Sequence, residues 1–329
     1  MISQEEALAR VVFEALERLG ADARADEVVN QIRTLRKGLP AEDEFALLIS
    51  FLGHCELVHS LDQSSAPATS RQTYRVPDLF AVFNCEGRRV PVLIEVKVSS
   101  APKLKWRVDY LDSLRRYAAL TNTPLLVAWK RPDLRLWNLI PSDHFRCART
   151  NVHLDLGTAL SESVLGLLAG DFGFTIASGT AFHFEASREA ITARTGTEET
   201  WLVRIRGAYF TAGNGSRIRT LQKGLFPLLV CAVAFNDSII DGTNIHFTSG
   251  VGDEDQFVLG QTMLPLLLNF TANAEQAIHW RTELRSQRLK LTARDLLTAA
   301  KTAIGGGVVR VVISPRPRHV PSFLAESAS

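Results

Sequence analysis

Apolar residues recur at helical spacing through the first part of the chain. Successive apolar positions three or four residues apart predict helices over residues 7–16, over about residues 26–37 and from about residue 41 to residue 52. Gly20 and Gly38 follow the first two runs, and glycine commonly ends a helix. The chain is therefore expected to begin with a helical segment.

A different pattern follows a polar loop, rich in serine, at residues 61–72. The pattern predicts, in chain order, strands over Tyr74–Phe83 and Val90–Val98, a helix over residues 107–120, and strands over Leu125–Trp129 and Arg135–Ile140. The run Leu125–Trp129 is fully apolar, which is typical of a strand buried inside a sheet. The order helix, hairpin, helix, strand predicts a compact α/β unit.

Beyond about residue 150, short strands alternate with turn signals. Strands are predicted over Ala181–Ala186, Trp201–Phe210, Arg217–Leu221, Ile245–Thr248 and Val308–Ile313. Asn214-Gly215 suits a hairpin loop because both residue types accept positive φ. Thr292 and Asp295 are spaced as a capping box at the start of a helix that runs to Lys301. The second half is therefore predicted to be an α+β domain, which divides the chain into residues 1–150 and 151–329.

Composition narrows the class of protein. The chain is 46% hydrophobic and 22% charged, which is typical of a soluble globular protein. Its apolar runs stay shorter than the roughly 20 residues that a membrane helix needs, and no signal peptide opens it. The four cysteines lie far apart without a CxxC pair, which disfavours a thiolate metal site and a disulfide framework. We expect a cytoplasmic protein with no membrane partner.

Positive charge is concentrated in one segment of the chain. The net charge is only +2, but residues 97–150 contain eleven Lys and Arg against four acids, a balance of +7. The rest of the chain therefore sums to −5. A basic segment indicates a surface where a polyanion docks, although a solvated basic surface would give the same count.

Two acids and a lysine come together if the predicted hairpin turns symmetrically about Glu86-Gly87. Side chains in a strand alternate between its faces, so Glu95 and Lys97 point the same way. The symmetrical turn places Asp78 opposite Glu95. The interleaved residues of Val92–Val98 are apolar, so the opposite face is expected to pack on a core. A hairpin with one solvated face is the alternative, and the apolar residues disfavour it.

This cluster suits one kind of chemistry. Adjacent carboxylates repel each other unless a cation lies between them. Mg²⁺ takes a few carboxylate oxygens and keeps several waters, which matches Asp78 and Glu95 as ligands. The amine of Lys97 could hold or deprotonate a water and stabilise charge on a phosphate. The three residues together predict the hydrolysis of a phosphodiester bond.

Pro77-Asp78, followed by Glu95-Val96-Lys97, resembles the motif of the PD-(D/E)xK nuclease superfamily, which includes restriction endonucleases and Holliday-junction resolvases. The similar order of elements covers about residues 41–140. The resemblance implies a restriction-endonuclease-like core preceded by the amino-terminal helices and followed by the α+β domain. It also implies a Mg²⁺ cofactor, for which Mn²⁺ can substitute, and DNA as the favoured substrate.

The resemblance adds two residues to the site. An acid on the preceding helix often joins such sites, and Glu44 is the matching candidate for a further catalytic residue. Glu42 and Asp43 are neighbouring alternatives. The carbonyl of Val96 is implied as a further contributor to the metal.

Basic and aromatic residues directly after the motif are candidates for nucleic-acid contact, since they can bind phosphates and stack a base. The first four are expected to open the helix that holds the last two: Lys103, Lys105, Trp106, Arg107, Arg115 and Arg116. Trp106 is equally consistent with a core residue. Weaker basic candidates are Lys130 and Arg131, expected just after a central strand, together with the strand pair Arg204 and Arg206 and the helix face Arg281, Arg285 and Arg288.

The favoured function is a Mg²⁺-dependent endonuclease, with restriction or antiviral defence offered by analogy. One alternative is a nucleic-acid-binding or assembly protein that keeps the fold without cutting. Others are an RNA-cleaving nuclease, or a nuclease gated by an effector. Residues 151–329 could bind a partner protein, form a homo-oligomer or contact nucleic acid.

Overall fold

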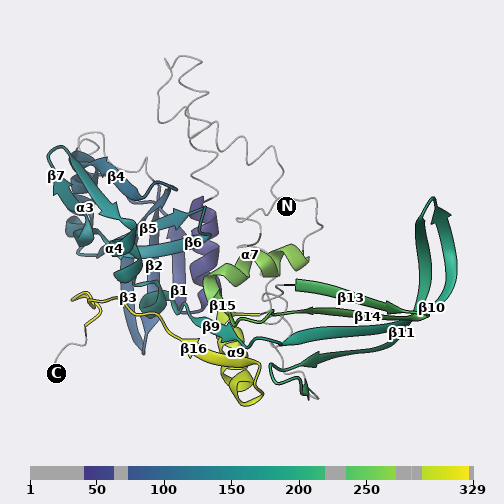
Figure 1. The fold of residues 1–329 in the computed structure, drawn as a ribbon. Coiled ribbons are helices and arrows are strands. Elements are labelled where there is room, and N and C mark those ends of the chain that lie inside the picture. Colours follow the sequence, from purple (N-terminus) through teal and green to yellow (C-terminus); the bar gives the residue numbers. More distant parts are fainter. Residues whose placement is uncertain (1–40, 63–72, 219–234, 272–282, 284–290, 326–329) are drawn as a thin grey trace. The chain divides into compact units, whose positions relative to one another are not determined.

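The computed structural model describes residues 41–62, 73–218, 235–271, 283 and 291–325 (Figure 1). They form a mixed α/β protein with several sheets and few helices. The chain divides into two compact units, the first of residues 1–171, 268–290 and 314–329 and the second of residues 172–267 and 291–313. Within the described ranges, no helix has both the length and the apolar composition that crossing a bilayer requires.

Several predicted features lie outside the described residues. They are the first two helices, over residues 7–16 and 26–37, most of the loop at residues 61–72, and the arginines Arg281, Arg285 and Arg288. The third predicted helix is present over residues 41–52, and it buries Phe45, Leu48, Ile49 and Leu52 as expected.

A five-stranded sheet forms the centre of the first unit. Its order is β1 (Cys55–Ser60), β2 (Leu79–Cys85), β3 (Arg88–Val98), β5 (Leu125–Arg131) and β6 (Leu136–Pro141). Neighbouring strands are antiparallel except for β3 and β5, which are parallel and are linked through helix α3 (Val108–Leu120). Strand β3 is therefore the middle strand, and the apolar strand predicted beside it is present as β5. The sequence pattern did not predict the strand β1.

The β2–β3 hairpin has the predicted register. Its pairs run from Leu79 with Ile94 to Cys85 with Arg88, across a two-residue turn at Glu86-Gly87. Both turn residues have positive φ, 54° and 89°, which is the geometry that suits the twist of a tight hairpin. Strand β2 begins at Leu79, so the strand predicted from Tyr74 was too long. Pro77 has no N–H for a ladder bond. The backbone carbonyl of Asp78 accepts from the N–H of Leu61 at 3.0 Å, and its side chain accepts from the N–H of Val96.

The core of the first unit lies between α3 and the sheet. Leu111, Leu114 and Ala118 of α3 are buried in one cluster with Val127 and Trp129 of β5. The Trp129 indole donates to the carbonyl of Ser99 at 3.0 Å, so this large side chain is buried with its polar atom satisfied.

Val98 was expected inside the core, but 42% of its surface is exposed. It is the last residue of β3, and burial along the strand already decreases at Lys97.

The segment after the motif is a strand and not the start of the helix. Strand β4 (Lys103–Arg107) pairs with β8 (Asn151–Asp155), which pairs with β7 (Arg146–Ala148). The predicted helical opening was wrong because this run alternates with period two. Leu104 is buried and Trp106 half-buried, while Lys103, Lys105 and Arg107 are exposed.

Strand β5 also extends further than predicted and includes Lys130 and Arg131, which were expected just after it. Lys130 continues the ladder with Trp137 of β6. Both residues make side-chain ion pairs, Lys130 with Glu44 and Arg131 with Asp133.

The second unit contains a larger antiparallel sheet. Its order is β12 (Arg217–Ile218), β11 (Glu198–Thr211), β10 (Ala181–Thr195), β14 (Asn244–Gly250) and β13 (Phe235–Asp241). A three-stranded sheet has the order β15 (Gln256–Leu259), β9 (Gly173–Ile176) and β16 (Val309–Ile313). Helix α9 (Ala293–Gly305) lies in this unit, and helix α7 (Gly260–Thr271) begins in it and ends in residues assigned to the first unit. The Asn214-Gly215 loop and the Thr292–Asp295 capping box are present as predicted.

Glu44 anchors the helix of residues 41–52 to the sheet. Its carboxylate is buried and accepts from the Lys130 ammonium of β5 and, at 3.1 Å, from the Trp137 indole of β6. Trp137 also packs on Phe45, with ring centroids 4.8 Å apart. One carboxylate therefore joins three elements.

We expect Glu44→Ala to lower the free energy of unfolding by about 2 kcal/mol or more, because it leaves a half-buried ammonium and a buried indole N–H without their acceptor. Glu56→Ala is the matched control, since Glu56 pairs with the exposed Arg89 and its loss should change stability little. Urea unfolding of both variants measures the difference. Equal stability of the two would show that Glu44 does not anchor the helix.

Candidate active site

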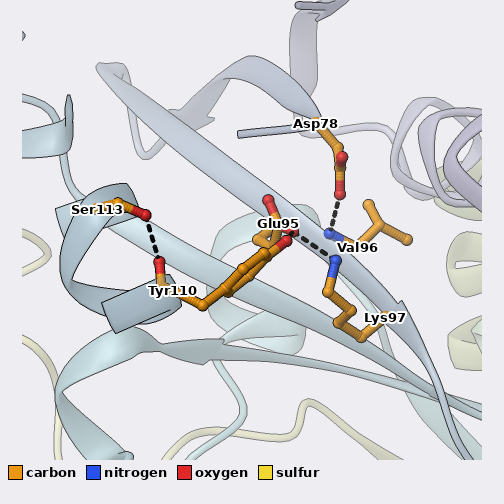
Figure 2. A network of polar contacts seen from close by, with 6 residues as sticks. All are labelled: Asp78, Glu95, Val96, Lys97, Tyr110 and Ser113. Atoms are coloured by element: carbon orange, nitrogen blue, oxygen red, sulfur yellow. Dashed lines mark hydrogen bonds and ion pairs between the residues drawn. The ribbon is translucent and has the colours of Figure 1, made fainter. Parts of the chain in front are cut away.

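The structure brings Asp78, Glu95 and Lys97 together, as Figure 2 shows. Asp78 immediately precedes β2, while Glu95 and Lys97 are two residues apart on β3. The hairpin register, continued by one residue beyond Leu79 and Ile94, sets Asp78 beside Glu95. Positions two apart on a strand share a face, which brings Lys97 to the same carboxylates.

Asp78 is held as a buried carboxylate. Only 6% of its surface is exposed, and its Oδ2 accepts from the backbone N–H of Val96 at 2.7 Å. Burial, followed by the negative charge of Glu95, raises the pKa of Asp78 well above its ordinary value. The charge of Lys97 and the Val96 N–H act in the opposite direction without cancelling the rise. A proton or another cation is needed here for the pair of acids to be stable.

Glu95 has one satisfied oxygen and one unsatisfied oxygen. The residue is 1% exposed, and its Oε1 accepts from both the Lys97 ammonium and the Tyr110 phenol. Its Oε2 is buried and has no hydrogen-bond partner among the described residues. A buried carboxylate oxygen without a donor costs free energy, and a bound cation would remove that cost.

Lys97 stays charged in this setting. Burial lowers the pKa of Lys97, but Glu95 and Asp78 outweigh burial and the net shift is upward. A lysine with a raised pKa holds its proton, so it is suited to stabilising negative charge or donating a proton. The roles predicted for Lys97, to hold or deprotonate a water and to stabilise charge on a phosphate, stay predictions.

Tyr110 is a member of the cluster that the sequence pattern did not indicate. It comes from the first turn of α3, and burial followed by the charge of Glu95 raises its pKa to about 12, so its phenol remains a donor. The Ser113 hydroxyl donates to the Tyr110 carbonyl at 2.8 Å within the helix. The ring has Lys97 Nζ at 5.4 Å from its centroid. Helical spacing alone gives Tyr110 no reason to face Glu95, because that contact is tertiary.

The residues present fit a hard divalent cation. Mg²⁺ is usually bound by one or two carboxylates and several waters, and Asp78 with the unsatisfied Oε2 of Glu95 supplies such a set. Among the residues that the structure describes, no three His, Cys, Asp or Glu side chains form a metal-binding group. The carbonyl of Val96 as a ligand stays a prediction.

Two of the candidates for a third acid, Glu44 and Glu42, differ in their contacts. Glu44 is occupied by Lys130 and Trp137. Glu42, two residues earlier on the same helix, is close enough for its charge to raise the pKa of Asp78. The catalytic role of Glu44 stays a prediction, as does the alternative role of Glu42.

The basic candidates fall into two groups. Lys103 and Lys105 are exposed on β4, and Trp106 beside them stacks on Phe145 with centroids 4.9 Å apart. Trp106 therefore has one ring face in the core, and it lies 5.7 Å from Lys97 Nζ. Arg107, the last residue of β4, forms an ion pair with Asp109, with 3.4 Å between guanidinium nitrogen and carboxylate oxygen.

Arg115 lies elsewhere in the first unit. It donates to the Ser142 carbonyl at 2.6 Å and has Asp112 at 3.8 Å, while its neighbour Arg116 is exposed. Arg115 lines an open hollow of about 650 Å³ together with Arg88, at the turn end of the hairpin. Arg88 is seven residues from Glu95 along β3, or about 23 Å. In the second unit, Arg204 pairs with Glu189, and Arg206 donates to Ser187.

Comparison with known proteins finds few similarities to this chain. No protein-family model matches it, and no curated protein matches its sequence. Among solved structures, it is similar to Hjc, a Holliday junction resolvase from the archaeon Archaeoglobus fulgidus, at 20% identity and a TM-score of 0.32. The match covers 41% of this chain and 96% of that one. A TM-score at this level establishes no common function, so the function has to be inferred from the residues of the site.

Proposed function

We propose that this protein is a metal-dependent nuclease that hydrolyses phosphodiester bonds, with DNA as the favoured substrate. The observation that carries the proposal is the buried, unsatisfied Oε2 of Glu95 beside the carboxylate of Asp78 and the charged Lys97. A structural ion pair needs one acid for one lysine. Here a second buried acid is added, and one carboxylate oxygen is left without a donor.

Each residue has a separate task in this proposal. Asp78, oriented by the Val96 N–H, and Glu95, oriented by Tyr110, hold the cation. A bound Mg²⁺ supplies a Lewis acid for the phosphate and lowers the pKa of a bound water. Lys97, whose ammonium keeps its proton, stabilises negative charge that develops on the phosphate oxygens. The negative charge of Glu42 contributes to the raised pKa of Asp78.

The resemblance of Pro77-Asp78 and Glu95-Val96-Lys97 to the PD-(D/E)xK motif supports the same chemistry. The exposed Lys103 and Lys105 offer phosphate contacts on the strand that follows. A role in defence, gating by an effector, a division of function at residue 150, and oligomerisation or partner binding through residues 151–329 stay predictions. A non-catalytic binding protein would have no need for the complete cluster.

The proposal predicts an unusual stability effect for Asp78→Asn. A folded-state pKa above the unfolded value means that Asp78 contributes stability at low pH, and that this stability is lost as the pH rises. In metal-free buffer at neutral pH, the variant should therefore unfold a few degrees higher than the wild type, at about 2–4 °C per kcal/mol. The gap should close as the pH falls toward the ordinary aspartate pKa.

Thermal unfolding with and without Mg²⁺ checks this prediction. Mg²⁺ should raise the midpoint of the wild type and leave that of Asp78→Asn nearly unchanged. Asp109→Asn, at an exposed aspartate of α3, is the control and should follow the wild type in both buffers. A destabilised, Mg²⁺-responsive Asp78→Asn would contradict the assignment of Asp78 as a ligand.

Cleavage should depend on Glu95 and Lys97 in different ways. Glu95→Gln should abolish nicking of plasmid DNA with Mg²⁺ and also abolish metal binding, because it removes a charged ligand. Lys97→Ala should keep metal binding and lose about 10²-fold or more in turnover. Nicking assays and titration calorimetry with Mn²⁺ separate the two effects. Glu86→Gln, at the exposed hairpin turn, is the control that should cut normally. Full activity of a folded Glu95→Gln protein would sink the proposal.

The two groups of basic residues should contribute unequally to DNA binding. Each lost phosphate contact lowers the slope of log affinity against log salt by about 0.9 on duplex DNA. We expect the Lys103→Ala, Lys105→Ala double variant to lose more slope than the Arg115→Ala, Arg116→Ala variant, because Arg115 already donates within the chain. Binding to a short duplex, with Ca²⁺ in place of Mg²⁺, measures both slopes. The reverse order would place the DNA at the hollow lined by Arg88 and Arg115.

A further inference from the structure

Arg75 is an exposed arginine held beside the candidate site. Its guanidinium lies 4.4 Å from the centroid of the Tyr110 ring. Its backbone N–H donates to the carbonyl of Ser113 at 3.2 Å, and the residues that follow it, Val76 to Asp78, are buried. The Tyr110 ring thus supports the guanidinium, and the hydrogen bond to Ser113 and the buried residues that follow hold the backbone of Arg75.

Within the described residues, no carboxylate lies at ion-pair distance from Arg75. The other basic side chains around the cluster have such partners, since Lys97 pairs with Glu95 and Lys130 with Glu44. Among the described residues, the guanidinium of Arg75 therefore has the Tyr110 ring face as its side-chain contact and no carboxylate partner. A cation–π contact leaves the donor edge of a guanidinium available to an anion.

The position of this charge relates it directly to the cluster. The phenol of Tyr110 donates to Glu95, while its ring supports Arg75. Lys97 Nζ lies 5.4 Å from the same ring centroid, so the two cations lie within about 10 Å of each other. Lys97 is the inner cation, engaged by the carboxylates, and Arg75 is the outer cation, open to solvent.

We propose that Arg75, presented on the ring of Tyr110, binds a backbone phosphate of the nucleic-acid substrate next to the one that is cleaved. This inference rests on the proposed nuclease function. Arginine suits the task because its planar fork can donate two parallel hydrogen bonds to phosphate oxygens. Tyr110 then has two separable functions: its hydroxyl orients Glu95, and its ring holds the phosphate contact.

The experiment measures binding of the full chain to a short DNA duplex over a series of salt concentrations, with Ca²⁺ in place of Mg²⁺. Arg75→Gln should weaken binding about tenfold or more and lower the salt slope by about 0.9, the value for one phosphate contact. Arg75→Lys should keep the slope and lose only part of the affinity, because it retains the charge without the fork. Arg89→Gln, an equal charge change near the hairpin turn, is the control and should bind as the wild type does.

Substitutions of Tyr110 separate its two functions. Tyr110→Phe should keep the salt slope, since the ring remains, but it should weaken Mn²⁺ binding measured by calorimetry because Glu95 loses a donor. Tyr110→Leu should lose both. Tyr117→Phe, on the same helix, is the matched control. A lowered salt slope in Tyr110→Phe would show that the hydroxyl, and not the ring, supports the contact, and would overturn this assignment.

The two proposals fail in distinguishable ways. If the wild type cuts DNA with Mg²⁺ while Arg75→Gln keeps its affinity and salt slope, the Arg75 contact is wrong and the nuclease assignment stands. If Arg75→Gln and Arg89→Gln lose slope equally, the effect is general charge and the contact is also wrong. A wild type that neither binds nor cuts nucleic acid would overturn both.

Discussion

Asp78 and Glu95 are two carboxylates held next to each other and covered by protein, and most of the site follows from their repulsion. Burial strengthens the repulsion, because little water is present to screen it, and the pKa of Asp78 rises in consequence. The chain surrounds the pair with donors: the Val96 N–H, the Lys97 ammonium and the Tyr110 phenol. These donors leave Glu95 Oε2 unsatisfied. Such an arrangement is costly for a structural role and well suited to holding a cation.

The β2–β3 hairpin brings the carboxylates of Asp78 and Glu95 next to each other. A two-residue turn at Glu86-Gly87 leaves only one register for β2 and β3, and that register sets Asp78 beside Glu95. Because side chains alternate along a strand, Lys97 follows on the same face. These features depend on local geometry, so the turn, the pairing and the three residues could all be predicted from the sequence. The capping box at Thr292 and the loop at Asn214-Gly215 were predictable for the same reason.

What could not be predicted depends on contacts between distant segments. The pairing of Lys103–Arg107 with β8, more than forty residues later, could not be predicted, although the alternation of polar and apolar residues within the run was visible in the sequence. The sequence does not distinguish Glu42 from Glu44. Only the contacts with Lys130 and Trp137 show that Glu44 binds to the sheet. Arg75, which precedes β2, contacts Tyr110 of α3, and no periodic pattern in the sequence predicts this contact.

The central claim is that Asp78 and Glu95 form a site for a hard divalent cation. Diffraction from crystals soaked in Mn²⁺, with the ion located by its anomalous signal, tests this most directly. We expect one ion bonded to Glu95 Oε2 and to a carboxylate oxygen of Asp78, with water in its other positions. An ion bound elsewhere while this pair remains without metal at saturating Mn²⁺ would contradict the claim.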